Sequence, residues 1–504
     1  MTKKRRRGGK LEQCAKALIL VTFVSISTAL RANNICVTNI SLTTPEIGYT
    51  HVQCDVRWDN SWKASWTEGE TTITNWDAAW IFIKYRVATN NAIWQHASLS
   101  TNRADHIVPS GASIDMGLTG DNGKGVFLYR ANEGSGAWTN TLQLCWNYVR
   151  DGISHPTPVD VQVLAIEMIY VPKGSFYLGS GGTEGGRLYE GGGGNKPFLV
   201  TNAGAISCAD TAGSLWGVSQ TGWDSMGGGG ELEASFPNGY NAFYCMKYEI
   251  SQGQWVTFFN TLTASQKTTV DITTNLYGGK NGDGTVFRNT VAWTGTGDAT
   301  CSTPDTACNF LDWADGIAYA DWAGLRPMTE LEFVKACRGP LMPAANEYAW
   351  GSSAIVQITG ISGTDGSGTE TALPANANSI YGNGPVKGPV RCGLFATATS
   401  GRAASGATYW GIMEMSGNLT ERVVTIGNAT GQAYTGTLGD GILTTDGRAN
   451  EATWPAGDAI GAGFMGGNWL DSLALLRVSD RTWVARTHRN RFYNLGFRAV
   501  RPAP

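Results

Sequence analysis

The chain has 504 residues, of which 42% are hydrophobic, so it is long enough for two or three globular domains. Its 66 glycines exclude a helical bundle and predict many turns and short elements. Its 19 tryptophans need a core or a binding surface, which excludes general disorder, and a formal net charge of −3 gives no general attraction for nucleic acid.

The N-terminus combines a basic run, Lys3 to Lys10, with an apolar stretch from Ala17 to Leu30 and small residues at Ala29 and Ala32. This layout predicts a secretory signal peptide over residues 1–32. The alternative is a membrane anchor, for which the apolar stretch is short. Cleavage would leave 30 basic and 40 acidic residues. We therefore expect an exported protein (periplasmic, cell-surface or secreted), with no nucleic-acid partner and no membrane insertion after cleavage.

Nine cysteines follow residue 32. In an exported protein, disulfides are favoured over metal ligands, and no C-x-x-C pair supports a zinc site. Cys301 and Cys308 flank a short polar loop, which predicts a local disulfide between them.

Residues 33–165 are predicted to form an all-β domain, with strands at 81–87 and 159–166. Two interpretations fit a dense group of tryptophans in this region. They form either a platform for stacking sugar rings, or the core and strand caps of an immunoglobulin-like sandwich, which we prefer. The group comprises Trp58, Trp62, Trp66, Trp76 and Trp80.

The larger region, 166–504, opens with a glycine-rich stretch at 179–230 that predicts a long loop. Ser251 with Gln254, and Thr329 with Glu332, form capping boxes that predict two helices. A further amphipathic helix is expected at 313–322, and loops and short strands after Gly339.

Short motifs in a fixed order over residues 166–501 resemble the formylglycine-generating-enzyme, or sulfatase-modifying-factor, family. The resemblance implies an α+β, C-type-lectin-like domain at 166–504, after the all-β, immunoglobulin-like sandwich at 33–165. It also implies that Arg477 and Arg498 hold loops rather than ligand. The motifs are M-I-Y-V-P-x-G-x-F-x-x-G from Met168, Y-E-I-S from Tyr248, G-L-R-P-M-T-E-L-E-F from Gly324, Y-A-W-G from Tyr348, M-S-G-N-L-T-E from Met415, G-G-N-W from Gly466 and N-L-G-F-R from Asn494.

Enzymes of this family hold copper(I) with two cysteine thiolates, soft ligands for a soft ion. The matching positions here are Asp471 and Leu476, and Asn468 replaces the family's serine. The resemblance therefore implies a protein without the family's catalytic residues, and we expect no copper. The five histidines show no close pairing that would support an iron site. The alternative hypothesis is a formylglycine-generating-enzyme-like oxidoreductase, or another metal-dependent enzyme on the same fold.

A structural calcium site is also implied by the resemblance. It would use the Glu414 side chain, the Gly417 and Leu419 carbonyls and the Glu421 side chain, which are hard oxygen ligands. Glu414 stands where the family often has asparagine, and Thr420 replaces its tryptophan. The alternative is a solvated acidic turn.

Residues 464–504 contain seven arginines and two aspartates, which predicts a basic C-terminal surface. Motifs that fit the fold alternate there with chemically unrelated residues, and region 465–498 resembles the variable region of diversity-generating-retroelement target proteins. We expect a non-catalytic binding surface for a protein or glycan ligand on another cell or surface. The alternative is that Phe492 and Tyr493 are core residues. The candidate ligand-binding residues are Leu470, Asp471, Ser472, Thr482, Trp483, Arg486, His488, Phe492 and Tyr493, and Thr487 shows the same pattern.

Overall fold

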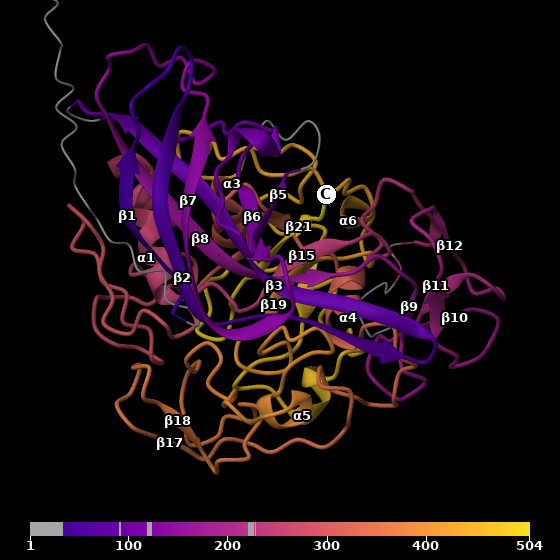
Figure 1. The fold of residues 1–504 in the computed structure, drawn as a ribbon. Helices are drawn as coiled ribbons and strands as arrows, with labels where there is room; N and C mark the ends of the chain where they lie inside the picture. Colours follow the sequence, from indigo (N-terminus) through magenta and orange to yellow (C-terminus); the bar gives the residue numbers. More distant parts are fainter. Residues whose placement is uncertain (1–33, 90–91, 118–122, 220–225, 227) are drawn as a thin grey trace, which may run out of the picture.

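The structure is a computed structural model that describes residues 34–89, 92–117, 123–219, 226 and 228–504. It has the predicted α+β character, with many strands and few helices (Figure 1). The predicted signal peptide lies outside the described residues. Within the described ranges, no helix is both long and apolar enough to cross a membrane.

Eight N-terminal strands form two layers that face each other across a buried apolar core. One layer contains β1, β2 and β7, and the other contains β3, β4, β5, β6 and β8. The long β2–β3 hairpin joins them. The strands are β1 (Cys36–Leu42), β2 (Thr50–Glu68), β3 (Thr71–Val87), β4 (Gln95–His96), β5 (Ala112–Met116), β6 (Val126–Arg130), β7 (Gly134–Trp146) and β8 (Val159–Val171).

Strand β3 is buried on both faces. Successive side chains of a strand point to opposite sides, so those of β3 enter two different cores. Ile81 and Ile83 enter the N-terminal core, whereas Trp80 and Phe82 enter the core of the second half. The next strands along the same sheet are β8, β15 (Phe243–Met246), β21 (Ala499–Pro502) and β16 (Arg326–Pro327). The predicted boundary at 165/166 therefore falls inside β8, which both halves share. The immunoglobulin-like identification stays a prediction.

The crowded tryptophans lie in or against these cores. Trp58 and Trp80 are fully buried, and Trp62, Trp66 and Trp76 pack against the second core. Trp80 Nε1 donates to the Ala323 carbonyl (2.8 Å). These contacts match the core interpretation, and they extend it, because the side chains join the two halves.

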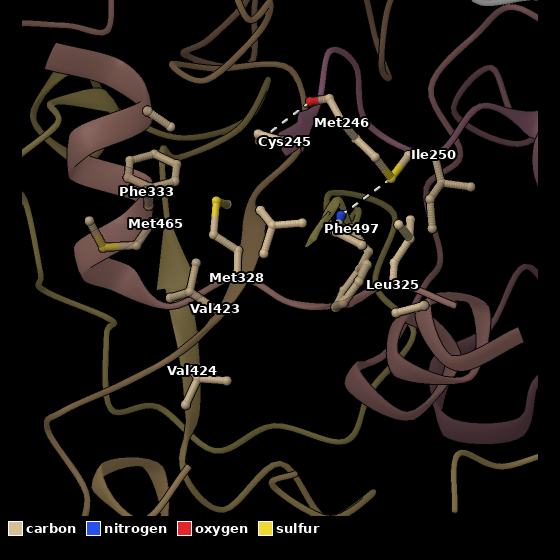
Figure 2. Packing of buried hydrophobic residues seen from close by; sticks show 14 of the residues in the cluster. Cys245, Met246, Ile250, Leu325, Met328, Phe333, Val423, Val424, Met465 and Phe497 are labelled. Atoms are coloured by element: carbon tan, nitrogen blue, oxygen red, sulfur yellow. Dashed lines mark hydrogen bonds between the residues drawn. The ribbon is translucent and has the colours of Figure 1, made fainter. Parts of the chain in front are cut away.

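The C-terminal half surrounds its sheet with short helices and irregular backbone (Figure 1). Both predicted capping boxes are present, at the starts of α1 and α4. Figure 2 shows Phe333 of α4 packed near Val423 and Met465. The helices are α1 (Gln252–Asn260), α2 (Ala264–Val270), α3 (Trp313–Trp322), α4 (Glu330–Arg338), α5 (Arg402–Ser405) and α6 (Ala429–Gln432). The nearby strands are β19 (Glu421–Val424) and β20 (Ala462–Met465), which pair antiparallel.

The glycine-rich stretch is more ordered than predicted. It forms small sheets at one side of the molecule (Figure 1). Strand β9 (Phe176–Leu178) pairs with β11 (Phe198–Val200), and a four-stranded sheet contains β10 (Leu188–Glu190), β12 (Ile206–Cys208), β13 (Leu215–Gly217) and β14 (Gly230–Leu232). The remaining pair, β17 (Gly360–Ser362) with β18 (Thr371–Leu373), lies after α4.

The disulfide prediction is wrong for this structure. All nine cysteines after residue 32 are free thiols, including Cys301 and Cys308. Seven of the nine are buried, where a thiol packs as a small apolar group.

Candidate ligand-binding site

A cavity of about 320 Å³ opens beside the C-terminal segment. Six of the nine predicted ligand-binding residues line it, whereas Leu470, Ser472 and Thr482 do not. Asn468, Thr420 and Phe464 complete much of the wall. The six are Asp471, Trp483, Arg486, His488, Phe492 and Tyr493.

In the C-terminal segment, the family-like motifs and the candidate ligand-binding residues differ in how deeply they are buried. The family-like motifs are mostly buried, as at Gly466–Trp469 and Leu495–Arg498. Each candidate ligand-binding residue is half-buried or exposed, and Ser472 and Thr487 are the exposed ones. The motifs therefore support the fold, and the residues between them reach the surface or the cavity.

The two positions that hold copper in the resembled family face different environments here. The Asp471 carboxylate lines the cavity and accepts a hydrogen bond from Asn468 Nδ2 (2.6 Å). Leu476 is fully buried in the apolar core. A carboxylate and an isobutyl group are not ligands for copper(I). The donor set at these positions therefore does not fit copper.

Burial raises the pKa of Asp471 to about 6, from an ordinary value of 3.8. Its folded-state pKa lies above the unfolded value, so its contribution to stability is complete below about pH 4 and is lost as the pH rises through 6. We therefore expect Asp471 to lower the free energy of unfolding by about 2 kcal/mol between pH 4 and pH 7, and we expect this decrease to be absent in Asp471→Asn. Urea unfolding at pH 4 and pH 7 measures it, with exposed Asp458→Asn as the control. Equal pH dependence in Asp471→Asn and wild type would contradict it.

The predicted basic surface is largely internal. Arg491 pairs with Asp315 (2.6 Å), Arg481 with Glu330 (2.5 Å) and Arg498 with Glu421 (2.6 Å), and each of these arginines is buried. Arg501 is buried too, with its guanidinium over the Trp80 ring. As expected, Arg498 holds loops, since it donates to the Met246, Lys247 and Met413 carbonyls. The more accessible arginines of the segment are Arg477 and Arg486, which are half-buried, and Arg489, which is exposed.

Aromatic side chains shape the cavity wall. The Phe492 and His488 rings lie 4.7 Å apart, and the Arg486 guanidinium lies 4.7 Å from the Trp483 ring. Tyr493 differs, because its ring packs against both Phe287 (4.5 Å) and Trp469 (5.7 Å). Phe492 and Tyr493 thus both line the cavity, but Tyr493 also supports the core.

Sequence reasoning missed the loop between α2 and α3. Phe287 and Tyr277 are about one-third exposed, at 37% and 36%, and lie beside the C-terminal segment. Tyr277 accepts a hydrogen bond from Arg489 through its hydroxyl (3.2 Å), and a Cβ at Gly278 would lie 3.8 Å from the Phe492 ring. The available signal was the presence of two aromatic residues in a loop rich in Gly and Asn.

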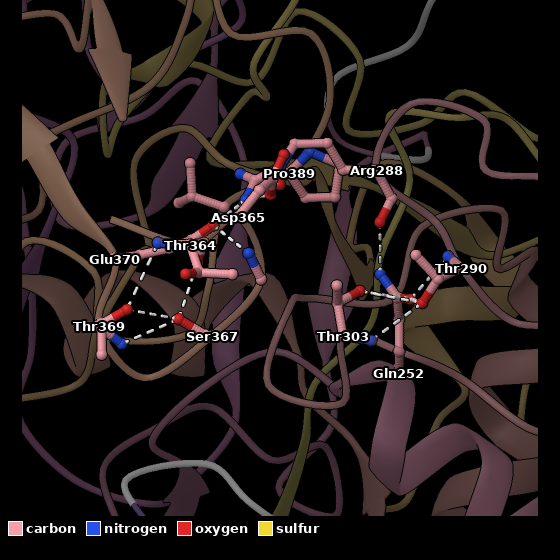
Figure 3. Close-up of polar contacts among 12 residues, drawn as sticks. Gln252, Arg288, Thr290, Thr303, Thr364, Asp365, Ser367, Thr369, Glu370 and Pro389 are labelled. Atoms are coloured by element: carbon pink, nitrogen blue, oxygen red, sulfur yellow. Dashed lines mark hydrogen bonds and ion pairs between the residues drawn. The ribbon is translucent and has the colours of Figure 1, made fainter. Parts of the chain in front are cut away.

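This loop is held in an unusual backbone conformation. Tyr277, Phe287 and Arg288 all have positive φ (55°, 46° and 61°), which side chains with a Cβ rarely adopt. Figure 3 shows the contacts that fix Arg288. Its guanidinium binds Asp365 (2.5 Å) and Glu370, and donates to the Pro389 carbonyl (3.0 Å). Its own carbonyl accepts from Gln252 (2.9 Å). The clamp holds Phe287 against Tyr493.

The residues of the predicted calcium site are engaged with protein groups. One Glu421 oxygen binds Arg498, and one Glu414 oxygen accepts the Gly393 N–H (3.0 Å). Among the residues that the structure describes, the second oxygen of each has no hydrogen-bond partner, and it is buried. Burial raises the pKa of Glu414 to about 7. Two orphaned carboxylate oxygens are suitable calcium donors, so these residues fit the ion in part.

A separate acidic group lies elsewhere. Asp321, Asp440 and Glu451 place ligand atoms within 4.8 Å of one another, and they form the one such group in the described part of the chain. Both Asp321 oxygens already accept backbone N–H groups, from Asp440 (3.0 Å) and Asn450 (3.1 Å). The predicted calcium ligands do not belong to this group.

Comparison with known proteins identifies the family of the chain. Residues 155–503 match the sulfatase-modifying factor enzyme 1-like domain. The chain is 33% identical over 91 residues to the formylglycine-generating enzyme of Bos taurus, covering 16% of this chain and 24% of that enzyme. It is 33% identical over 84 residues to that of Mus musculus, covering 14% and 23%. These matches span about a quarter of the length of either enzyme. The chain belongs to the sulfatase-modifying factor enzyme 1-like domain family.

Proposed function

We propose that this protein is an exported, non-catalytic ligand-binding member of its family, which binds a protein or glycan of another cell or surface through the C-terminal cavity. The observation that carries the proposal is the cavity wall. It includes Asp471, which matches one of the two copper-binding positions of the resembled enzymes in sequence, and it offers this carboxylate and aromatic side chains instead of thiolates. Tyr, Trp and Arg side chains are the types that dominate binding energy at protein interfaces.

Diversification by a retroelement is part of the proposal. The family-like motifs are mostly buried, and the residues between them are more accessible. The residues between the motifs could therefore vary without loss of the fold. Surface substitutions usually change stability by only about half a kcal/mol. A reverse transcriptase gene and a near-copy of the codons for 465–498 in the neighbouring DNA are the expected finding.

Binding is tested with a glycan array and a displayed library of random peptides. We expect selected ligands to lose roughly tenfold or more in affinity with Arg486→Ala or Phe492→Ala, because such residues each contribute over 1 kcal/mol. Melting temperatures should change little. Exposed Arg57→Ala is the matched control. Ligands that bind both cavity variants as tightly as wild type would refute the cavity as the binding site.

A structural calcium ion is a further part of the proposal, supported by the orphaned oxygens of Glu414 and Glu421. Calcium that binds only the folded state raises the melting temperature. We expect a rise in millimolar calcium relative to chelator, and no rise in Glu414→Gln. Glu414 is the better residue to change, because Glu421 also serves Arg498. Identical melting in calcium and chelator would exclude the ion.

A further inference from the structure

Two carboxylates line the C-terminal cavity, Asp471 and Asp480, and they differ in how fully the protein engages them. Asp480 is engaged on both oxygens, because Oδ1 accepts the Thr482 N–H (3.1 Å) and Oδ2 accepts the Gly185 N–H (3.1 Å). Asp471 accepts through Oδ2 from Asn468 Nδ2 (2.6 Å), and Asn468 is the one side-chain partner of its carboxylate among the described residues. The other oxygen of Asp471, Oδ1, is therefore available to a ligand in the cavity.

The negative charge of Asp471 is not neutralised by a neighbouring cation. Within the described ranges, no lysine, arginine or histidine forms an ion pair with Asp471. Arg486 lines the same cavity, but its guanidinium lies over the Trp483 ring, 4.7 Å from the centroid. Burial, and the nearby charge of Asp480, raise the pKa of Asp471. A cation bound beside this carboxylate would offset the cost of its partial removal from water.

Aromatic rings form much of the remaining lining. Phe464, Phe492 and Tyr493 all line the cavity, and each is half-buried. His488 lines it too, and burial lowers the pKa of this ring, so that it is mostly neutral at pH 7. Ring faces attract cations, and the methylene stem of a long basic side chain packs on apolar surface. The lining therefore suits a cation that is carried on an apolar stem.

The engaged oxygen of Asp471 favours lysine over arginine as the source of this cation. A bidentate arginine–carboxylate pair uses both carboxylate oxygens, but Asn468 already binds Oδ2. The ammonium of lysine is a compact charge that needs one oxygen only.

We propose that a lysine side chain of a partner protein enters the C-terminal cavity, with its ammonium on Asp471 and its stem against Phe492 and Tyr493. Lysine recognition rests on the ligand-binding function proposed above, and it makes the ligand a protein rather than a glycan. It also makes Asp471 the residue that determines specificity, whereas the rings supply contact area.

Peptides selected on the full chain from the displayed random library test the proposal. We expect them to share a lysine at one position. Exchange of this lysine for methionine should weaken binding to wild type roughly tenfold, as the loss of one charged hydrogen bond predicts. Exchange for arginine should weaken it less.

A double-mutant cycle then assigns the contact to Asp471. Asp471→Asn should weaken the lysine peptide by a similar factor, whereas the methionine peptide should bind Asp471→Asn and wild type equally. Exposed Asp458→Asn is the matched control and should bind both peptides as wild type does. Thermal melting confirms that Asp471→Asn is folded, and the peptide exchange tests the same contact without a change in the protein.

Three results would overturn lysine recognition and leave the proposed function in place. They are cavity-dependent peptides that share no lysine, a lysine peptide that binds Asp471→Asn as tightly as wild type, and cavity-dependent binding of glycans without any peptide. Ligands that are all insensitive to Arg486→Ala and Phe492→Ala would instead refute the proposed function, and lysine recognition with it.

Discussion

Arg498→Met should destabilise the protein by about 3–5 kcal/mol, because it leaves the Glu421 carboxylate buried without its cation. Both partners are fully buried, at 0% exposure, and the Nε–Oε1 distance is 2.6 Å. Arg498 also donates to three backbone carbonyls, so the loss removes contacts that join β15 to the 413–421 turn. Urea unfolding at pH 7 measures the change.

An exposed ion pair provides the control for this experiment. Arg57 and Asp59 lie 3.1 Å apart, with side chains 59% and 31% exposed, and Arg57→Met should cost at most about 1 kcal/mol. The double variant Arg498→Met/Glu421→Leu should recover part of the loss, since an apolar pair avoids the unpaired charge. A cost for Arg498→Met no larger than that for Arg57→Met would contradict the structural role.

The fragment 155–504, although it contains the whole family-matched region, should not fold alone. Without β3 it would expose the face of β8 and the core positions that Trp80 and Phe82 fill. Removing a buried Trp or Phe side chain alone costs about 3–5 kcal/mol, and total stability is commonly only about 5–15 kcal/mol.

Circular dichroism and thermal melting of this fragment, beside residues 34–504, test the expectation. The longer chain should melt cooperatively, whereas the fragment should bind a hydrophobic dye and show no cooperative transition. A fragment that melts at the temperature of the longer chain would show that the C-terminal half is an independent domain, as the sequence had suggested.

Local signals in the sequence predicted much of the fold. The capping boxes at Ser251 and Thr329 depend on residues three positions apart, so a single sequence is enough to find them. The alternation of family-like motifs with other residues in 465–498 pointed to nine candidate residues, of which six line the cavity. Trp483 and His488 are examples.

Long-range contacts could not be predicted in this way. The partners of Arg481 and Arg491 lie 151 and 176 positions earlier in the chain, so their burial as ion pairs was not visible, and the segment read as a basic surface. For the same reason, the sequence alone could not show that β3 and β8 each contribute side chains to two cores. Phe287 was missed because its position depends on the Arg288 clamp, which is built from Asp365, Glu370 and Pro389.

The proposed function assigns ligand binding, and no copper chemistry, to the C-terminal cavity beside Asp471. The most direct test incubates the protein with copper(I) and a sulfatase-type cysteine peptide, with an active formylglycine-generating enzyme as the positive control. Mass spectrometry then measures formylglycine aldehyde in the peptide. We predict no aldehyde above the protein-free reaction, because Asp471 and the core residue Leu476 cannot hold copper(I). Aldehyde above that level, from protein free of other enzymes, would contradict the account.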